Sequence, residues 1–317
     1  MAKSVLPSTW ENRFKEPGKG APWVTESSVA NEAEEEEPHY TTPPSSEILA
    51  SEVHNELGLN VLYALQDRKI LTTNSYNLSA VYCEPTTNVS SRTNTVQVLV
   101  HGATLSKVMW DFPYQPEKYS WVRHATSEGF STLAFDQVGA GNSSKPDGLL
   151  EAQCQTYVET IHQIVEMLRG RQTSGKKFDK VITIGFSLGS ISLVSLAKQY
   201  PADADALVLH GFSWNAATLY QGFFAGLQEA AALIDPQKWG YLPSTYTTQS
   251  TPASREATVF YGNFDPGIVP IDFALRDFDT LGASITIPSH SLYVWEYTGP
   301  VFLGNGNGKL PLPIFRR

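Results

Sequence analysis

Apolar runs and amphipathic stretches alternate through the middle of the chain. Near-continuous Val, Leu, Ile and Phe runs at residues 96–100, 131–135, 181–184 and 205–210 are typical of strands covered on both faces. Between the second and third runs, residues 154–169 carry apolar side chains at helical spacing, which predicts a crossover helix. Strand and helix in alternation indicate an α/β fold of the doubly wound type.

The N-terminal part lacks this periodicity. Residues 1–50 are rich in Pro, Ser, Thr and Glu, and we predict a disordered, acidic extension because little apolar surface is there to offset the entropy of ordering. A short helix is predicted within residues 48–59. The apolar stretches 61–65 and 78–83 follow, and the turn-forming residues between them favour an antiparallel hairpin.

A long segment, from residue 213 to about 296, separates the strand at 205–210 from the last predicted strand at 298–306. The segment begins with an amphipathic stretch at 216–234, which predicts a helix. Its aromatic and Leu side chains suit either a helix packed on the core or a wall for a hydrophobic acyl group.

Composition and charge narrow the classes of partner. The net charge of −9 and the pI near 5.3 argue against nucleic acid and anionic membranes as partners. No apolar run of transmembrane length and no signal-peptide pattern are present, so we expect a cytoplasmic protein. Cys83 and Cys154 form no metal or disulfide framework, and we interpret them as buried free thiols, although a single bridge between them stays open.

The most informative motif is Gly185-Phe186-Ser187-Leu188-Gly189, which follows a Val/Ile-rich strand and precedes a helical stretch. In a nucleophile elbow the serine lies on a strained strand-to-helix turn, and small residues two positions on either side let strand and helix approach closely. Gly185 and Gly189 meet that requirement, so Ser187 is a candidate nucleophile.

Two other loops are predicted at the same sheet edge. His101-Gly102 follows the strand at 96–100, and the glycine-rich residues 136–146 follow the strand at 131–135. Because ligands bind beyond the carboxyl ends of strands in such sheets, we expect both loops to lie near Ser187. A His-Gly pair in this place can direct backbone N–H groups at a developing oxyanion, but a plain glycine turn explains the same residues.

These three motifs, in this order, resemble the α/β-hydrolase superfamily. The segment Trp110-Asp111-Phe112-Pro113 after the His-Gly loop is similar to that of fungal esterase- or lipase-like members. The resemblance covers residues 60 to 305 approximately. It implies a mostly parallel sheet with helices on both faces, a helical cap formed by the insertion at about 213–296, and one hydrolase domain over residues 51–317.

The resemblance also implies site roles. Ser187 would be the nucleophile, and the backbone N–H of Leu188, together with that of Ala103 or Thr104, would form the oxyanion hole. No metal or organic cofactor is implied, and the partner is a small ester or acyl substrate. Phe186 stands where relatives often carry His, which implies altered packing near the serine.

The acid and the histidine of a triad are not evident. In this fold they follow the serine in the chain, but residues 304–317 contain neither an acidic residue nor a histidine. We therefore expect that the last strand and helix of the fold are missing from this sequence. Asp265 and His290 are the candidate substitutes, although Asp265 also fits an ordinary Asp-Pro turn. His210, at a strand end, and His101, in the oxyanion loop, are interpreted as structural.

Two hypotheses follow. The chain is a serine hydrolase that acts on an ester or similar acyl substrate through Ser187. Alternatively, it is a catalytically incomplete relative, which keeps the turn and pocket as a binding protein or an inactive truncated form. The sequence leaves the oligomeric state open.

Overall fold

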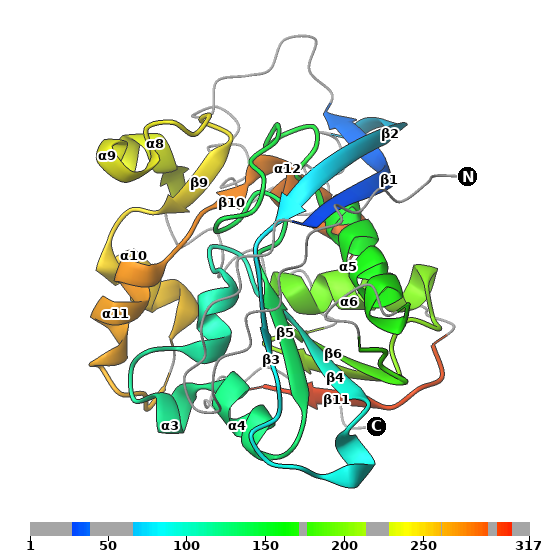
Figure 1. The fold of residues 1–317 in the computed structure, drawn as a ribbon. Coiled ribbons are helices and arrows are strands. Elements are labelled where there is room, and N and C mark those ends of the chain that lie inside the picture. Colours follow the sequence, from blue (N-terminus) through cyan, green and yellow to red (C-terminus); the bar gives the residue numbers. More distant parts are fainter. Residues whose placement is uncertain are drawn as a thin grey trace.

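A sheet of six strands runs through the computed structural model (Figure 1), which describes residues 27–38, 66–170, 176–213, 228–260, 262–290 and 297–305. In spatial order its strands are β11 (Val301–Gly304), β7 (Ala206–His210), β6 (Lys180–Phe186), β4 (Thr95–Val100), β5 (Ser131–Phe135) and β3 (Ala80–Cys83). Neighbouring strands are parallel except β3, which runs antiparallel to β5. The mostly parallel α/β sheet predicted from the apolar runs is confirmed.

Helices cover both faces of this sheet. α5 (Cys154–Arg169) and α6 (Leu188–Gln199) pack on one face, and the short helices η2 (Lys107–Asp111) and α4 (Trp121–Ser127) pack on the other. α3 (Pro116–Tyr119) precedes α4, and η1 (Ser90–Arg92) precedes β4. Every residue of β4 and β5 is buried, as a strand covered on both sides requires.

The segment between β7 and β11 contains a second, smaller sheet. Its antiparallel strands are β8 (Gln228–Ala230), β9 (Tyr246–Gln249) and β10 (Asp279–Thr280), accompanied by α8 (Ala231–Ile234), α9 (Pro236–Trp239), α10 (Pro252–Val259) and α11 (Ile268–Leu275). This unit, which we call the insertion, has its own apolar cluster around Trp239, Tyr246 and Phe278. The expected cap is therefore not only helical.

One expectation for this segment is corrected. The helix predicted over 216–234 is a strand at β8 and a short helix at α8 over its described residues, while residues 214–227 lie outside the described part. α12 (Leu281–His290), near the end of the predicted cap, packs against α5 and α6 and contributes Leu281, Ala283 and Ile285 to the main core. The cap bounds of about 213–296 stay a prediction.

The N-terminal expectations also change. β1 (Ser27–Pro38) pairs antiparallel with β2 (Gln66–Leu78), so residues 27–38 are not the disordered extension predicted for 1–50. The prediction was wrong because it relied on the polar side chains of this segment. Hydrogen bonds to a partner strand satisfy the backbone N–H and C=O groups whatever the side chains are. β3 pairs with β5, while the stretch 61–65, expected as the other strand of a hairpin, and the helix expected at 48–59 lie outside the described residues.

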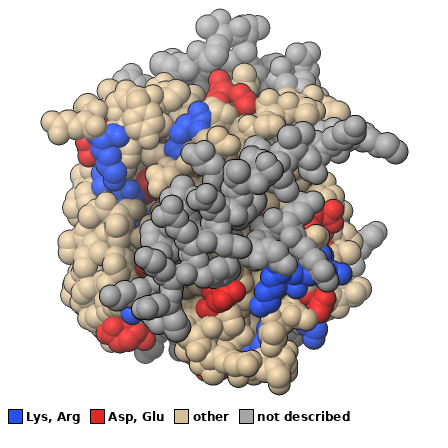
Figure 2. Space-filling model, in the orientation of Figure 1, with Lys and Arg blue, Asp and Glu red and all other residues tan. Residues whose placement is uncertain are grey.

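The surface shows no dominant charge field on the face seen in Figure 2, where acidic and basic side chains of the described residues lie interspersed among uncharged ones. Within the ranges that the structure describes, no helix has both the length and the apolar character needed to cross a membrane. Neither Cys83 nor Cys154 forms a disulfide, and the buried Cys154 thiol donates to the Ala283 carbonyl oxygen.

Candidate active site

Ser187 lies on the turn between β6 and α6, with φ 51° and ψ −115°. A positive φ is rare for a residue with a Cβ and signals backbone strain that the surroundings must maintain. A Cβ on Gly185 would lie 2.6 Å from the Ser190 nitrogen, and one on Gly189 would lie 2.3 Å from the Val100 carbonyl oxygen. The two glycines thus allow the close strand-helix packing that holds the serine in this conformation.

The His-Gly loop at the end of β4 lies beside this turn. A Cβ on Gly102 would be 3.1 Å from the Ser187 Cβ, so the glycine permits the approach of the two segments. The buried His101 ring uses both nitrogens, because Nδ1 is 2.9 Å from the Gly102 carbonyl oxygen and Nε2 accepts a hydrogen bond from the Gln137 N–H at 3.0 Å. Burial lowers the pKa of His101. This neutral ring joins two loops and is structural, as the sequence interpretation holds.

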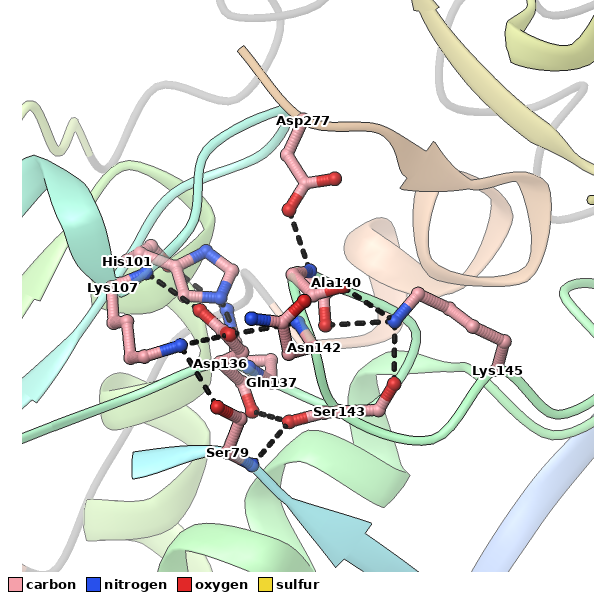
Figure 3. Close-up of polar contacts among 11 residues, drawn as sticks. Ser79, His101, Lys107, Asp136, Gln137, Ala140, Asn142, Ser143, Lys145 and Asp277 are labelled. Atoms are coloured by element: carbon pink, nitrogen blue, oxygen red, sulfur yellow. Dashed lines mark hydrogen bonds and ion pairs between the residues drawn. The ribbon is translucent and has the colours of Figure 1, made fainter. Parts of the chain in front are cut away.

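The third predicted loop, residues 136–146, is fixed by a buried carboxylate (Figure 3). Asp136 accepts hydrogen bonds from the backbone N–H of Lys107 at 2.8 Å and of Asn142 at 2.9 Å, and its carboxylate pairs with the Lys107 ammonium. The Lys145 ammonium donates to the carbonyl oxygens of Ala140 at 3.1 Å and of two further residues of the loop. The loop is therefore rigid where it borders the site.

These loops enclose a small pocket with a cavity volume of about 10 Å³, which is room for about one water-sized group. Its lining combines residues from the ends of β4, β5 and β6 with a strip from the insertion: His101, Gly102, Thr104, Gln137, Gly139, Ala140, Tyr157, Leu188, Phe278, Asp279 and Thr280. Two of the predicted oxyanion-hole residues, Leu188 and Thr104, thus share one pocket. Ala103, the third, does not line it and packs at the edge of the main core.

The insertion holds Thr104 in place. Thr104 has φ 56°, its carbonyl oxygen accepts from the Asp277 N–H at 3.0 Å, and its hydroxyl is 2.6 Å from a guanidinium nitrogen of Arg255. Arg255 is fully buried and forms a bidentate pair with Asp272. A side chain of α10 therefore stabilises a strained residue of the oxyanion loop, which nothing in the sequence pattern indicates.

Two buried acids of the insertion were missed by the sequence analysis. Asp277 accepts from the Gly141 N–H and from its neighbour's N–H, and burial raises its pKa to about 6. Burial raises the pKa of Asp279, which lines the pocket, to about 7. The sequence did contain one signal for this pair of acids. They flank Phe278 two residues apart, and residues at that spacing lie on the same face of an extended chain.

Asp265 and His290, the candidate acid and base, are not brought together by any described contact. The Asp265 carboxylate accepts hydrogen bonds from the Tyr114 hydroxyl at 2.9 Å and from the Gln115 amide, and a backbone N–H from Gly267 helps to lower its pKa. These are the contacts of a loop anchor. His290 is the last residue of α12, and its side chain lies outside the described residues.

His210 supports the turn through its backbone. Its carbonyl oxygen accepts from the Ser187 N–H and from the Ser190 hydroxyl, both at 2.9 Å. Its ring packs edge-on against Trp121 at 5.3 Å between centroids, and burial lowers its pKa. The structural role expected for His210 fits these contacts. Among the described residues no group of three or more His, Cys, Asp and Glu side chains is arranged to hold a metal ion.

Comparisons with known proteins place this geometry in context. A family model described as serine aminopeptidase, S33, matches residues 119–255. Similar solved structures include a carboxylesterase of the thaumarchaeon Nitrososphaera gargenis, with TM-score 0.45 and 16% identity over 74% of this chain and 78% of that one. A probable hydrolytic enzyme of Pseudomonas aeruginosa has TM-score 0.43 and 16% identity over 73% of this chain and 69% of that one.

An epoxide hydrolase mutant of Vigna radiata has TM-score 0.33 and 17% identity, and the match covers 43% of this chain and only 36% of that enzyme. No curated protein sequence matches the chain. The expected likeness to fungal esterases stays a prediction. The family match over residues 119–255, the strand order and the strand-turn-helix at Ser187 together are those of the α/β-hydrolase fold.

Proposed function

We propose that the chain is a serine hydrolase that cleaves an ester or similar acyl substrate. The Ser187 hydroxyl oxygen forms a bond to the acyl carbon, its proton passes through a base to the leaving group, and water then releases the acyl group from the enzyme. The observation that carries this proposal is the strained backbone of Ser187, at φ 51°, beside a pocket lined by Leu188 and Thr104.

The proposed oxyanion hole consists of the backbone N–H of Leu188 and that of Ala103 or Thr104. Leu188 is the first residue of α6, where N–H groups have no partner within the helix and where the helix dipole favours negative charge. Donors fixed in this way stabilise the tetrahedral intermediate without reorganising during the reaction. Because Gly102 has no side chain, its backbone lies close to Ser187, which keeps the proposed oxyanion-hole N–H groups near the serine hydroxyl.

His290 as base and Asp265 as its partner remain proposals, and two observations weigh against them. The ten residues of α12 span about 15 Å, so the His290 backbone lies far from Thr280 at the pocket. Asp265 is already engaged by Tyr114.

A second candidate function is supported by the same observations. A catalytically incomplete relative would keep the turn and the pocket and bind a ligand without turning it over. The occupied nitrogens of His101 favour it, because that ring is not free to accept the serine proton.

Activated-serine chemistry distinguishes the two candidates. We expect a fluorophosphonate probe to label the folded protein at Ser187, and Ser187→Ala to abolish labelling and to lower p-nitrophenyl butyrate hydrolysis by at least about a thousandfold. His290→Ala and Asp265→Asn, assayed in parallel, test the two proposed partners. Unlabelled wild-type protein that unfolds cooperatively would reject the hydrolase and favour the binding protein.

A further inference from the structure

Two buried hydrogen-bond acceptors of pocket residues have no partner among the described residues. They are Oδ2 of Asp279 and Oε1 of Gln137, and both residues line the pocket beside Leu188 and Thr104. Gln137 is 2% exposed and Asp279 is 5% exposed. A buried acceptor that lacks a donor destabilises the fold, so two in one small pocket require an explanation.

The orientation of both groups is fixed by their other atoms. The amide nitrogen of Gln137 donates to the His101 carbonyl oxygen at 2.9 Å, so the amide cannot rotate to present its N–H₂ group to the pocket. Oδ1 of Asp279 accepts from the Thr280 N–H at 2.9 Å, which leaves Oδ2 as the free oxygen. Burial raises the pKa of Asp279 to about 7, so above about pH 7, where the assays below are run, Asp279 is ionised and both side chains offer acceptors.

The ammonium groups of the neighbouring lysines already bind other residues. The Lys145 ammonium is bound by three carbonyl oxygens of its own loop, and the Lys107 ammonium by Asp136 and Ser79 (Figure 3). No ion pair involving Asp279 occurs among the described residues. Among the described residues, no nearby cation supplies the donor that these two acceptors lack.

We propose that Asp279 and Gln137 bind a hydrogen-bond donor group, a hydroxyl or an ammonium, that the substrate carries on its acyl part near the carbonyl carbon. This inference rests on the proposed function, because the same pocket contains the candidate oxyanion donors of Leu188 and Thr104. Its cavity volume of about 10 Å³ leaves room for about one water-sized group, which suits a hydroxyl or ammonium on a short acyl chain. The preferred substrates are short hydroxyacyl or aminoacyl esters.

The test compares three p-nitrophenyl esters of one chain length: butyrate, 3-hydroxybutyrate and 3-aminobutyrate. We expect kcat/KM of the wild-type protein to favour at least one donor-bearing ester over butyrate by about tenfold or more, because a site with buried acceptors discriminates against a ligand that leaves them unpaired. A preference for the 3-hydroxybutyrate ester would indicate recognition of a hydroxyl, and a preference for the 3-aminobutyrate ester would indicate recognition of an ammonium. Equal kcat/KM for all three esters would overturn the proposal.

Asp279→Asn is the matching variant. Its carbonyl oxygen can keep the Thr280 contact, so its N–H₂ group replaces Oδ2 and presents a donor to the pocket. We expect the preference for the donor-bearing ester to disappear while butyrate turnover changes less. Asp277→Asn, a buried acid two residues away whose Oδ2 already binds the Gly141 N–H, should keep the preference. A preference that survives Asp279→Asn would contradict the assignment.

Binding without turnover separates failure of this inference from failure of the proposed function. Ser187→Ala protein is titrated calorimetrically with butyramide, 3-hydroxybutyramide and 3-aminobutyramide. Donor-selective binding by a protein that hydrolyses no ester would support the pocket assignment and reject the hydrolase. Ester hydrolysis with no donor-selective binding would support the hydrolase and reject the pocket assignment.

Discussion

The two sides of the pocket are held by different physical means. On the sheet side, Gly102 and Leu188 follow strand ends and are fixed by close backbone packing around Ser187. On the insertion side, the strip from Asp277 to Thr280 is fixed by buried charges and the hydrogen bonds that satisfy them. Close backbone packing requires glycines at defined spacing, which can be recognised in the sequence. Charge pairing between distant segments requires no such local pattern.

Thr104 is where the two sides meet. It follows β4 in the chain, but its strained conformation is stabilised from the insertion through Arg255 and the Asp277 N–H. One side of the pocket is fixed by backbone packing and the other by buried charges. Mutations and changes of pH should therefore affect the stability of the two sides differently. The following experiments test that difference.

Arg255→Met should have the largest effect on stability. The substitution leaves the Asp272 carboxylate buried without its partner and removes the donor to the Thr104 hydroxyl, so we expect a loss of about 3–5 kcal/mol in the free energy of unfolding. Urea denaturation measures it. Arg255→Met combined with Asp272→Leu should recover much of the loss, because no unpaired charge then remains.

Arg276→Met provides the control for that experiment. Arg276 belongs to the same insertion, but its guanidinium lies over the Phe273 ring at 3.6 Å and donates to backbone carbonyls without contacting Thr104. A loss as large as that of Arg255→Met would show that any buried arginine of the insertion has this effect, and the special role of the Thr104 contact would be withdrawn.

Gly189→Ala tests the sheet side. The added Cβ would lie 2.3 Å from the Val100 carbonyl oxygen, so α6 must move away from β4 at a cost of about 3 kcal/mol. Chemical denaturation and fluorophosphonate labelling report stability and turn geometry. Ser192→Ala, on the same helix, removes only a hydroxyl that donates to the Leu188 carbonyl oxygen and should cost about 1 kcal/mol or less. Equal losses would contradict the packing argument.

The pH dependence of stability should come from the insertion side. Burial raises the pKa of Asp279 from 3.8 to about 7, so the folded state keeps a proton that the unfolded state releases. The free energy of unfolding therefore falls as pH rises from about 4 to about 7, by at most about 1.4 kcal/mol per pH unit for this group. Denaturation at a series of pH values should show that Asp279→Asn removes this contribution.

Asp277→Asn separates the two acids. The pKa of Asp277 is raised to about 6, so its contribution should fall between about pH 4 and pH 6 and then level off, while that of Asp279 continues to about pH 7. If neither variant changes the pH dependence, the two carboxyls are not perturbed by burial and the charge-based description of this side fails.

Sequence patterns predicted the sheet side of the site with few errors. Continuous apolar runs predicted β4, β5 and β6, and the strand-to-helix turn at Ser187 was predicted from the spacing of Gly185 and Gly189. The same reasoning failed for β1 and β8, where polar or amphipathic stretches found strand partners elsewhere in the chain. The hydrogen bonds that pair these strands are formed by backbone N–H and C=O groups, which are present whatever the sequence.

The sequence by itself determined the mostly parallel sheet, the helices on its faces and the strained turn at Ser187, because each follows from residue types at short, regular spacing. Tertiary structure alone decided that Arg255 supports Thr104, 151 residues away in the chain, and that Asp279 joins Gln137 in one pocket. The physical reason is that a buried polar group is satisfied by whichever partner the fold brings near, and that choice has no local signature.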